Sequence, residues 1–353
     1  IVAGTGEKNH LVQYVSEYLA DHQKQKHILA YDALTSYHDQ GIITSMDSRT
    51  RAYIKIQEGC NRFCSYCLIP FARGQVRSRD PQEIVLEAET LLAHGFRELV
   101  LPGINTALYG TEEAFAYPLT AAEQAAGMHG IEIIISRVNA LDGDFRIRLS
   151  SLEPTVVNAD YVKRLLQYEK LCPHLHLSIQ SGSDAVLQAM HRHYSRADYL
   201  DIVRVLKAHD PHYGITTDII CGFPGETDAD FADSVRIVKE AGFLKVHAFK
   251  YSKREGTAAC EMKNQVPGEV KNERVTALIE AGERAAEIFL GESIGEVRTV
   301  LFEEAADEAG LICGYAENYV KVYARGSAAD FNCFQKVKLL TLYQDGLKGE
   351  ILP

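Results

Sequence analysis

Residues 53–74 read YIKIQEGCNRFCSYCLIPFARG, and three cysteines within this stretch determine most of what the sequence predicts. Cys60, Cys64 and Cys67 have the spacing C-x3-C-x2-C. Three thiolates on one short loop can each hold one iron of a cubane [4Fe-4S] cluster, which leaves the fourth iron open to a small molecule. A closed structural metal site would need a fourth protein ligand. The spacing therefore favours a reactive cluster over a structural metal.

A structural zinc site remains the alternative interpretation of these cysteines. The chain has eight cysteines, and the other five are Cys172, Cys221, Cys260, Cys313 and Cys333. None of them forms a second close pair, whereas zinc sites usually combine two such pairs. A zinc-stabilised, non-catalytic RNA-binding protein would need one of these distant side chains, or another residue, as its fourth ligand.

The sequence around the cysteines predicts an α/β fold. Ile54 and Ile56 alternate as in a strand, and Glu58-Gly59 interrupts the pattern just before the first cysteine. Predicted strands are 53–58, 98–102, 132–135, 146–150, 174–179, 215–220 and 245–250, and predicted helices are 80–94, 158–170, 184–191, 195–208, 228–241 and 269–290. This alternation predicts a parallel sheet with helical crossovers. From about Gly291 onward, short β-rich stretches predict a small antiparallel barrel.

The cysteine loop resembles that of radical S-adenosylmethionine (SAM) enzymes, and GCNRFCSYCLIPFARG (59–74) resembles their methylthiotransferase branch. The similarity continues through LPGINTALYG (101–110), RIRLSSLEP (146–154), HLHLSIQSGSDAVLQAMHRHY (174–194), TTDIICGFPGETDADF (216–231) and HAFKYSKREGTA (247–258). CEMKNQVPGEVKNERV (260–275) is most similar to the bacterial branch that acts on threonylcarbamoyladenosine in tRNA. The combination of motifs is specific, although any one of them alone would be weak evidence.

The resemblance implies a domain organisation. Residues 50–286 would form a partial (β/α)6 radical SAM barrel, and 287–353 a TRAM-like, RNA-binding β-barrel. Residues 1–49 resemble the end of an N-terminal methylthiotransferase domain plus a linker, so we expect the chain to be a fragment. In relatives, the absent N-terminal segment carries a second [4Fe-4S] cluster.

The resemblance also implies the reaction. A reduced cluster on Cys60, Cys64 and Cys67 cleaves SAM, and the resulting 5′-deoxyadenosyl radical abstracts hydrogen from C2 of a modified adenosine. The second cluster supplies sulfur, and an external electron donor supplies electrons. The product is a 2-methylthio-adenosine at position 37 of the tRNA anticodon loop. The alternatives within the family are isopentenyladenosine in tRNA and an aspartate of a ribosomal protein.

For SAM, the resemblance assigns Tyr66 and Ile220 to the adenine, Gly103 to the amino group, Ser151 and Glu153 to polar groups, Gln180 and Ser181 to the ribose, and Arg192 to the carboxylate. A guanidinium fork fits two carboxylate oxygens. Burial of an unpaired carboxylate is expensive, so Glu153 should meet a cation or a hydroxyl. The alternatives are that Tyr66 packs the loop, that Glu153 caps a helix, and that Ser183 caps the helix starting at Asp184 rather than binding ribose.

Composition limits the partners of the protein. The formal net charge is −11, with 37 Lys and Arg against 48 Asp and Glu, which argues against indiscriminate binding of polyanions. An RNA contact must therefore use local groups, and the candidates are Arg73, Arg77, Arg79, Lys321 and Arg325. The alternative is that some of these arginines, or Arg62, hold the cysteine loop. No apolar run approaches the length of a membrane span, and we expect a cytoplasmic protein.

Overall fold

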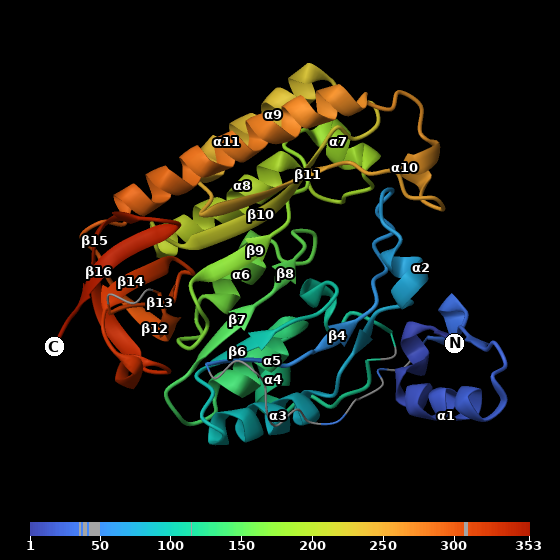
Figure 1. Ribbon diagram of the computed structural model, residues 1–353, viewed down its shortest axis with the longest axis horizontal. Helices are drawn as coiled ribbons and strands as arrows, with labels where there is room; N and C mark the ends of the chain where they lie inside the picture. The colour runs from blue at the N-terminus through green and yellow to red at the C-terminus, as the bar shows by residue number, and fades with distance from the viewer. Residues whose placement is uncertain (35–36, 38–40, 42–49, 114, 307–309) are drawn as a thin grey trace.

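The structure of the protein is a computed structural model that describes residues 1–34, 37, 41, 50–113, 115–306 and 310–353. Its central part is a parallel sheet (Figure 1). The first half consists of β3 (Arg51–Tyr53), β6 (Glu98–Leu101) and β7 (Arg146–Leu149), and the second of β8 (Ser151–Leu152), β9 (His174–Leu177), β10 (Gly214–Cys221) and β11 (Lys245–Lys250). Because β7 and β8 are one strand interrupted at Ser150, the halves provide six parallel positions in the order β3, β6, β7/β8, β9, β10, β11.

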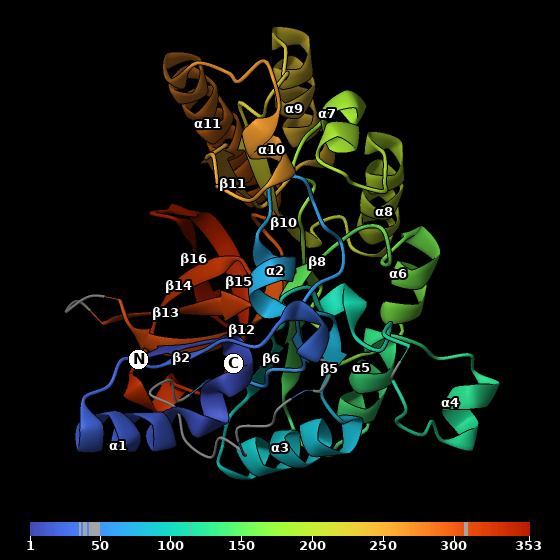
Figure 2. The same cartoon turned by 90° about the vertical axis from the view of Figure 1, so that its right-hand side faces the viewer.

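The sheet is open, since its edge strands β3 and β11 do not pair with each other in the described part of the chain. The helices that follow the strands lie along its outer side, as Figure 2 shows for α5, α6 and α8. They are α3 (Pro81–Ala93), α5 (Ile131–Asn139), α6 (Ala159–Leu165), α7 (Asp184–Ala189), α8 (Arg196–His209), α9 (Asp228–Ala241) and α11 (Gly268–Glu292). Buried residues such as Ile147, Leu175 and Ile215 pack against these helices in one continuous core.

Most predicted elements are confirmed, but the strand predicted at 132–135 is wrong. Ile131–Asn139 forms helix α5, in which Ile131, Ile134, Ile135 and Val138 are fully buried in the core. These positions have the i, i+3, i+4, i+7 spacing of a helix face. The run of β-branched residues suggested a strand, and packing of this face outweighed that weak local preference. The strand predicted at 53–58 is also divided, into β3 and β4 (Gln57–Glu58).

The C-terminal region forms a closed five-stranded barrel, at the left of Figure 1. Its order is β12 (Val297–Ala305), β13 (Leu311–Ala316), β14 (Lys321–Arg325), β16 (Gly346–Ile351) and β15 (Phe334–Tyr343), which closes back on β12. Its pairs are antiparallel as predicted, except that β14 and β16 are parallel. Val300, Phe302, Val322 and Leu339 fill its interior.

A buried group of charges joins this barrel to the amino-terminal ends of the parallel strands. Glu98, the first residue of β6, lies 2.5 Å from Arg146 Nε, 2.8 Å from Arg148 Nε and 3.5 Å from Arg51 Nε. Arg146 and Arg148 also donate to the carbonyl oxygens of Tyr315 and Glu317, at 3.0 and 3.3 Å. The barrel therefore covers this end of the sheet.

The amino-terminal segment lies near α2 (Ile69–Arg73), on the side of the molecule opposite the C-terminal barrel (Figure 1). It contains a 3-10 helix (Thr5–His10), α1 (Leu11–Asp21) and the parallel pair of β1 (Val2–Ala3) with β2 (Lys26–His27). The Thr5 hydroxyl donates to Ala72 O at 3.2 Å. The linker predicted at residues 25–50 lies partly outside the described residues, which exclude 35–36, 38–40 and 42–49. None of the described helices is both long and apolar enough to cross a membrane.

Candidate active site

A short hairpin base holds the cysteine loop at the carboxyl end of the first strands. β4 pairs antiparallel with β5 (Arg77–Ser78), and Cys60 N donates to Gly74 O at 3.1 Å. Gly59 has φ +73°, and a Cβ there would lie 1.7 Å from Gln75 O, so the tight crossing requires glycine. After the last cysteine α2 begins, and Ile69 N donates to Cys67 Sγ at 3.4 Å.

Segments distant in sequence anchor the middle of the loop. Ser65 Oγ donates to Ala189 O at 2.8 Å, and Ser65 N donates to Met190 O at 3.1 Å, at the end of α7. Ala259 N, in α10 (Ala258–Glu261), donates to Ser65 O at 2.7 Å. Ser65, which lies between two of the cysteines, is thus fixed by the end of α7 and by α10.

All three cysteines line one cavity of about 220 Å³. Its other walls come from the carboxyl ends of successive strands and the loops after them: Arg62, Tyr66, Ile69, Ile104, Asn105, Ser151, Leu152, Glu153, Ser178, Gln180, Arg192 and Asp218. Reactive groups at this end of parallel strands are typical of barrel enzymes. The cavity therefore brings together the sequence-predicted residues Tyr66, Ser151, Glu153, Gln180 and Arg192.

Glu153 and Arg192 are two of the charged residues that line the cavity, together with Arg62 and Asp218. Glu153 Oε2 lies 2.9 Å from Arg62 Nε, as an ion pair without hydrogen-bond alignment, and Oε1 lies 3.7 Å from Arg192 Nη1. Arg192 Nη2 donates to the Tyr66 hydroxyl at 2.7 Å. Burial lowers the pKa of Arg192, but Tyr194, Tyr66, Cys64 and Glu153 more than offset this, so its pKa is raised and it remains a cation. Burial raises the pKa of Tyr66, which remains a neutral phenol.

Two buried polar atoms on the cavity wall are left for a ligand. Among the described residues, no hydrogen-bond partner reaches Asn105 Oδ1 or Arg192 Nε. Unpaired buried groups of this kind are costly, and a zwitterion carrying an ammonium and a carboxylate would satisfy one acceptor and one donor. The donor set therefore fits the amino-acid portion of SAM.

Burial keeps two of the three thiols protonated in the absence of a metal. It raises the pKa of Cys60 to about 11 and also raises the pKa of Cys64, so both are neutral until a metal replaces the proton.

The remaining residues predicted to bind SAM do not line the cavity themselves. Gly103 directly precedes Ile104 and Asn105, which line the cavity. The backbone N–H of Asn105 donates to Gln57 Oε1 at 3.0 Å. Ile220 packs against Tyr66 and Phe223, beside the cavity. Ser181 does not line the cavity, because it is fully buried with its Oγ 3.4 Å from Ser234 Oγ. Ser183 is the N-cap of α7, as the alternative predicted.

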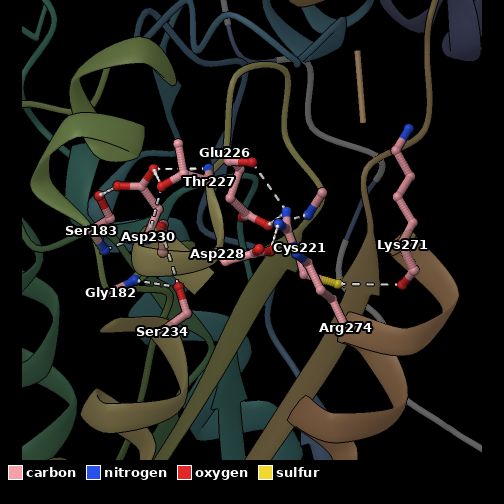
Figure 3. Close-up of polar contacts among 12 residues, drawn as sticks. Gly182, Ser183, Cys221, Glu226, Thr227, Asp228, Asp230, Ser234, Lys271 and Arg274 are labelled. Atoms are coloured by element: carbon pink, nitrogen blue, oxygen red, sulfur yellow. Dashed lines mark hydrogen bonds and ion pairs between the residues drawn. The ribbon is translucent and has the colours of Figure 1, made fainter. Parts of the chain in front are cut away.

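A charged turn that contains Glu226 and Asp228 follows β10 (Figure 3). Gln180 has φ +68°, its N–H donates to Asp218 O at 2.9 Å, and its carbonyl accepts from Ile220 N at 2.8 Å. Arg274 of α11 reaches into the turn and donates to Glu226 Oε1 and Asp228 Oδ1, both at 2.7 Å. The Ser183 hydroxyl donates to Asp230 Oδ1 at 2.6 Å, which ties α7 to α9.

Sequence reasoning did not assign Asn105, Ser178 and Asp218 to the site, although all three line the cavity. Asn105 lies inside a quoted motif, directly after the glycine turn. Ser178 and Asp218 could have been found from the period-two alternation of their strands, since they share a face with Gln180 and Ile220. That inference also requires the register between β9 and β10, which the sequence does not provide.

The predicted RNA-binding residues have different environments. Arg77 is buried and donates to the carbonyls of Leu34, Arg73 and Gln75, and Arg79 is buried beside Glu87. Arg77 therefore holds the end of the loop, as the alternative interpretation predicted, whereas the Arg79 side chain is tied to α3. Arg73 is partly exposed, 3.2 Å from Glu58. On the C-terminal barrel Lys321 lies 3.1 Å from Asp345, and Arg325 is exposed.

Comparison with known proteins agrees with the class that the parallel sheet and the three-cysteine cavity indicate. The family model "Radical SAM superfamily" matches residues 54–238. Among solved structures, coproporphyrinogen III oxidase (HemN) from Escherichia coli, titled a radical SAM enzyme, is similar over 69% of this chain and 53% of its own, with 16% identity and a TM-score of 0.45.

The names of similar proteins identify a branch within the radical SAM class. The chain is 36% identical to the "Threonylcarbamoyladenosine tRNA methylthiotransferase MtaB" of Bacillus subtilis, over 96% of this chain and 73% of that protein. It is 37% identical to the "tRNA-2-methylthio-N(6)-dimethylallyladenosine synthase" of Caldicellulosiruptor saccharolyticus, over 89% of this chain and 64% of that protein. The chain thus belongs to the methylthiotransferase family of radical SAM enzymes.

Proposed function

We propose that this enzyme methylthiolates C2 of threonylcarbamoyladenosine at position 37 in the anticodon loop of tRNA. Relatives from Bacillus subtilis, Chlamydia pneumoniae and Thermotoga maritima that carry the corresponding name are 34–37% identical to this chain. The observation that carries the proposal is the shared cavity, in which Cys60, Cys64 and Cys67 face Glu153 and Arg192.

In this proposal Cys60, Cys64 and Cys67 hold a [4Fe-4S] cluster, and SAM occupies the rest of the cavity. Cluster and SAM would supply one-electron chemistry that replaces hydrogen at C2 by a methylthio group, with an external electron donor and sulfur from a second cluster. Arg192, already fixed by Tyr66, would bind the SAM carboxylate through its free Nε. Asn105 Oδ1 would accept from the ammonium, near the position the resemblance gave to Gly103.

The other SAM contacts follow from the placement of the walls. Ser151 and Gln180 line the cavity and are proposed to bind hydroxyl groups, whereas Ser181 would act only through the position of its backbone. Tyr66 and Ile220 form an apolar edge for the adenine. Glu153 would hold Arg62 and Arg192 in place through its two ion pairs.

For RNA, we propose that the C-terminal barrel is a TRAM-like module, with Lys321 and Arg325 as contacts. Arg73, beside the cysteine loop, is the remaining candidate near the cavity, since Arg77 and Arg79 are engaged internally. The division into 1–49, 50–286 and 287–353, with the first part a remnant of an N-terminal methylthiotransferase domain, belongs to the same proposal. So does a cytoplasmic location, where tRNA is modified.

The cluster assignment is tested by anaerobic reconstitution with iron and sulfide. Cys64→Ser should lose most of the iron and sulfide and should not produce 5′-deoxyadenosine from SAM, while the matched control Cys333→Ser, an exposed cysteine, should behave as the wild type. One zinc per chain without acid-labile sulfide would contradict the proposal and support the zinc-stabilised RNA-binding alternative.

The substrate is tested with hairpin RNAs that carry either modified adenosine at position 37. The assay uses the enzyme together with the N-terminal segment in which the second cluster is expected. The methylthio product should then form with the threonylcarbamoyl hairpin, detected by mass spectrometry of the digested nucleosides. The second candidate is the dimethylallyl substrate, because a relative with that name is equally similar. A product from the dimethylallyl hairpin alone would favour that candidate. Activity on neither hairpin would direct attention to the ribosomal-protein aspartate.

A further inference from the structure

A polar cluster on the inner face of the sheet has no role in the contacts proposed so far. This inner cluster consists of His176 in β9, Ser178 directly after β9, Thr216 and Asp218 in β10, and His247 in β11. The register of the paired strands places these side chains on one face of the sheet, since Thr216 pairs with His176 and Asp218 pairs with His247. Ser178 and Asp218 also line the cavity of the cysteines. The cluster is therefore adjacent to the SAM site.

A chain of hydrogen-bonding groups orients Asp218. His174 Nε2 lies 3.3 Å from Thr216 Oγ1, which lies 2.9 Å from His176 Nδ1. His176 Nε2 lies 3.2 Å from Asp218 Oδ2, and the Ser178 hydroxyl donates to the same oxygen at 3.1 Å. One tautomer satisfies every contact: His176 donates from Nε2 to Asp218, and its Nδ1 accepts from Thr216. These hydrogen bonds thus direct two donors at Oδ2 of Asp218.

The other oxygen of Asp218 is available. Both contacts described above end on Oδ2, and no donor among the described residues reaches Oδ1. The Asp218 side chain is 27% exposed, so a ligand can approach it. Burial raises the pKa of Asp218, but His176, Ser178 and His247 outweigh burial and lower it. Asp218 is therefore an ionised acceptor with one fixed and one free oxygen.

A free carboxylate oxygen next to a radical site imposes a requirement on the substrate. When a substrate fills the space and displaces water, this oxygen loses its solvation unless the substrate offers an N–H or O–H group. A threonylcarbamoyl substituent offers ureido N–H groups and a hydroxyl, whereas a dimethylallyl substituent is a hydrocarbon. The inner cluster thus matches the polar substituent and penalises the apolar one.

We propose that Oδ1 of Asp218, with the carboxylate fixed by His176 and Ser178, accepts a hydrogen bond from the N6 substituent of the target adenosine and selects the threonylcarbamoyl group over a hydrocarbon. The inference rests on the proposed function and names the specificity residue of that site. In this proposal the carboxylate of the substituent meets Lys245, which β11 presents on the same face opposite Thr216.

The test compares the wild type with Asp218→Asn on the two hairpin RNAs described above. We expect kcat/KM for the threonylcarbamoyl hairpin to fall by roughly 10- to 100-fold, the value of a hydrogen bond to a charged group. The value for the dimethylallyl hairpin should fall by less than a tenth as much, or rise. Asp201→Asn, an exposed residue of α8, is the matched control and should leave both values unchanged.

Dissociation constants measured separately for SAM and for each hairpin identify the group that Asp218 contacts. Weakened binding confined to the threonylcarbamoyl hairpin supports the inference, whereas weakened binding of SAM alone overturns it. Equal losses on both hairpins, or none, also overturn it while leaving the proposed function intact. A wild type that is inactive on the threonylcarbamoyl hairpin overturns both. Should Asp218→Asn fail to fold, Ser178→Ala, which removes one donor to Oδ2, should show the same selectivity change at about 3-fold.

Discussion

At the scale of single residues, Gly59 shows how closely the cysteine loop is packed. Its φ of +73° is unfavourable for any residue with a side chain, and the space that a Cβ needs is occupied by the carbonyl of Gln75. The same crossing carries the hydrogen bond from Cys60 N to Gly74 O. The position of the first cysteine therefore depends on a residue that has no side chain.

We predict that Gly59→Ala destabilises the loop by at least about 1–2 kcal/mol from backbone strain alone, and lowers iron incorporation on reconstitution. Gly268→Ala is the matched control, because its Cβ would meet no atom within 4 Å at the start of α11. Urea unfolding and iron content per chain measure the two effects. Wild-type iron content and stability in Gly59→Ala would show that the loop moves to accommodate the methyl group.

Residues of the site differ in how far the sequence alone could place them. The cysteines were predicted from spacing, because three ligands on one loop are local in the chain. Arg192 and Glu153 were assigned by resemblance, and the structure places both on the cavity wall. Ser181 faces the opposite side, toward Ser234, because the strand direction changes at Gln180, whose φ is positive. Such a local backbone reversal is not encoded in a period-two pattern.

At the scale of elements, predictions succeeded where local signals and packing agree. Thr227 starts α9 with a capping box to Asp230, and Asp80 caps α3 ahead of a proline in its first turn. The α5 segment failed because the sequence IEIIISRVN satisfies both a strand preference and a helical spacing. Only the core of the folded protein selects between them, through burial of Ile131, Ile134 and Val138.

Glu98 links the first three parallel strands through the arginines at their starts. Burial raises its pKa, but Arg148 and Arg146 outweigh burial and hold the pKa far below the usual range. We predict that Glu98→Gln costs about 3–5 kcal/mol near pH 7, because the buried guanidinium groups lose their counterion. Urea unfolding of the two proteins at the same pH measures the difference, and an unchanged midpoint would contradict the prediction.

Because the pKa of Glu98 is lowered in the folded protein, the free energy of unfolding depends on pH. A depressed folded pKa adds stability above the unfolded pKa of about 4.3, and this contribution is lost as pH falls below it. The wild type should therefore lose its advantage over Glu98→Gln by about 1.4 kcal/mol per pH unit between roughly pH 4 and pH 2. A difference that stays constant over this interval would show that Glu98 titrates normally.

Arg274 connects α11 to the turn after β10, and its partner Glu226 is buried (Figure 3). Burial raises the pKa of Glu226, so its charge relies on Arg274 and the N–H of Gly222. We predict that Arg274→Ala costs about 3 kcal/mol and weakens SAM binding, because the turn supports the wall with Ile220. Arg284→Ala, on an exposed part of the same helix, should change the unfolding free energy by less than about 0.5 kcal/mol. Equal effects of the two substitutions would exclude a supporting role for the turn.

At the scale of the whole molecule, the C-terminal barrel closes the end of the sheet that lies opposite the cavity. Besides the arginines around Glu98, Asn318 donates to His212 O at 3.0 Å, and Asn332 donates to Gly95 O at 2.7 Å. The sequence predicted a small barrel here, but not its docking, since each contact joins residues about 100 or more positions apart. Long-range polar contacts of this kind leave no local pattern.

Arg298 is the clearest test of whether the barrel and the sheet unfold together. Its guanidinium donates to both oxygens of Asp210, at 2.6 and 3.0 Å, and to Glu296 at 2.8 Å. Burial raises the pKa of Asp210, but Arg298 outweighs burial and lowers it, so both groups stay charged. We predict that Arg298→Ala costs about 2–3 kcal/mol, because Asp210 loses a bidentate partner in a mostly buried position.

The loss should also uncouple the two parts of the molecule. In the wild type we expect one calorimetric transition, and in Arg298→Ala a separate, lower transition for the C-terminal barrel, since the packing of Leu244, Phe289 and Leu290 against the barrel core would then hold it with fewer polar contacts. Arg204→Ala, which breaks an exposed pair with Asp201 on α8, is the control and should leave the transition unchanged. If Arg298→Ala unfolds in one step at the wild-type midpoint, docking must depend on the arginines around Glu98 instead, and Arg146 becomes the residue that couples the two parts.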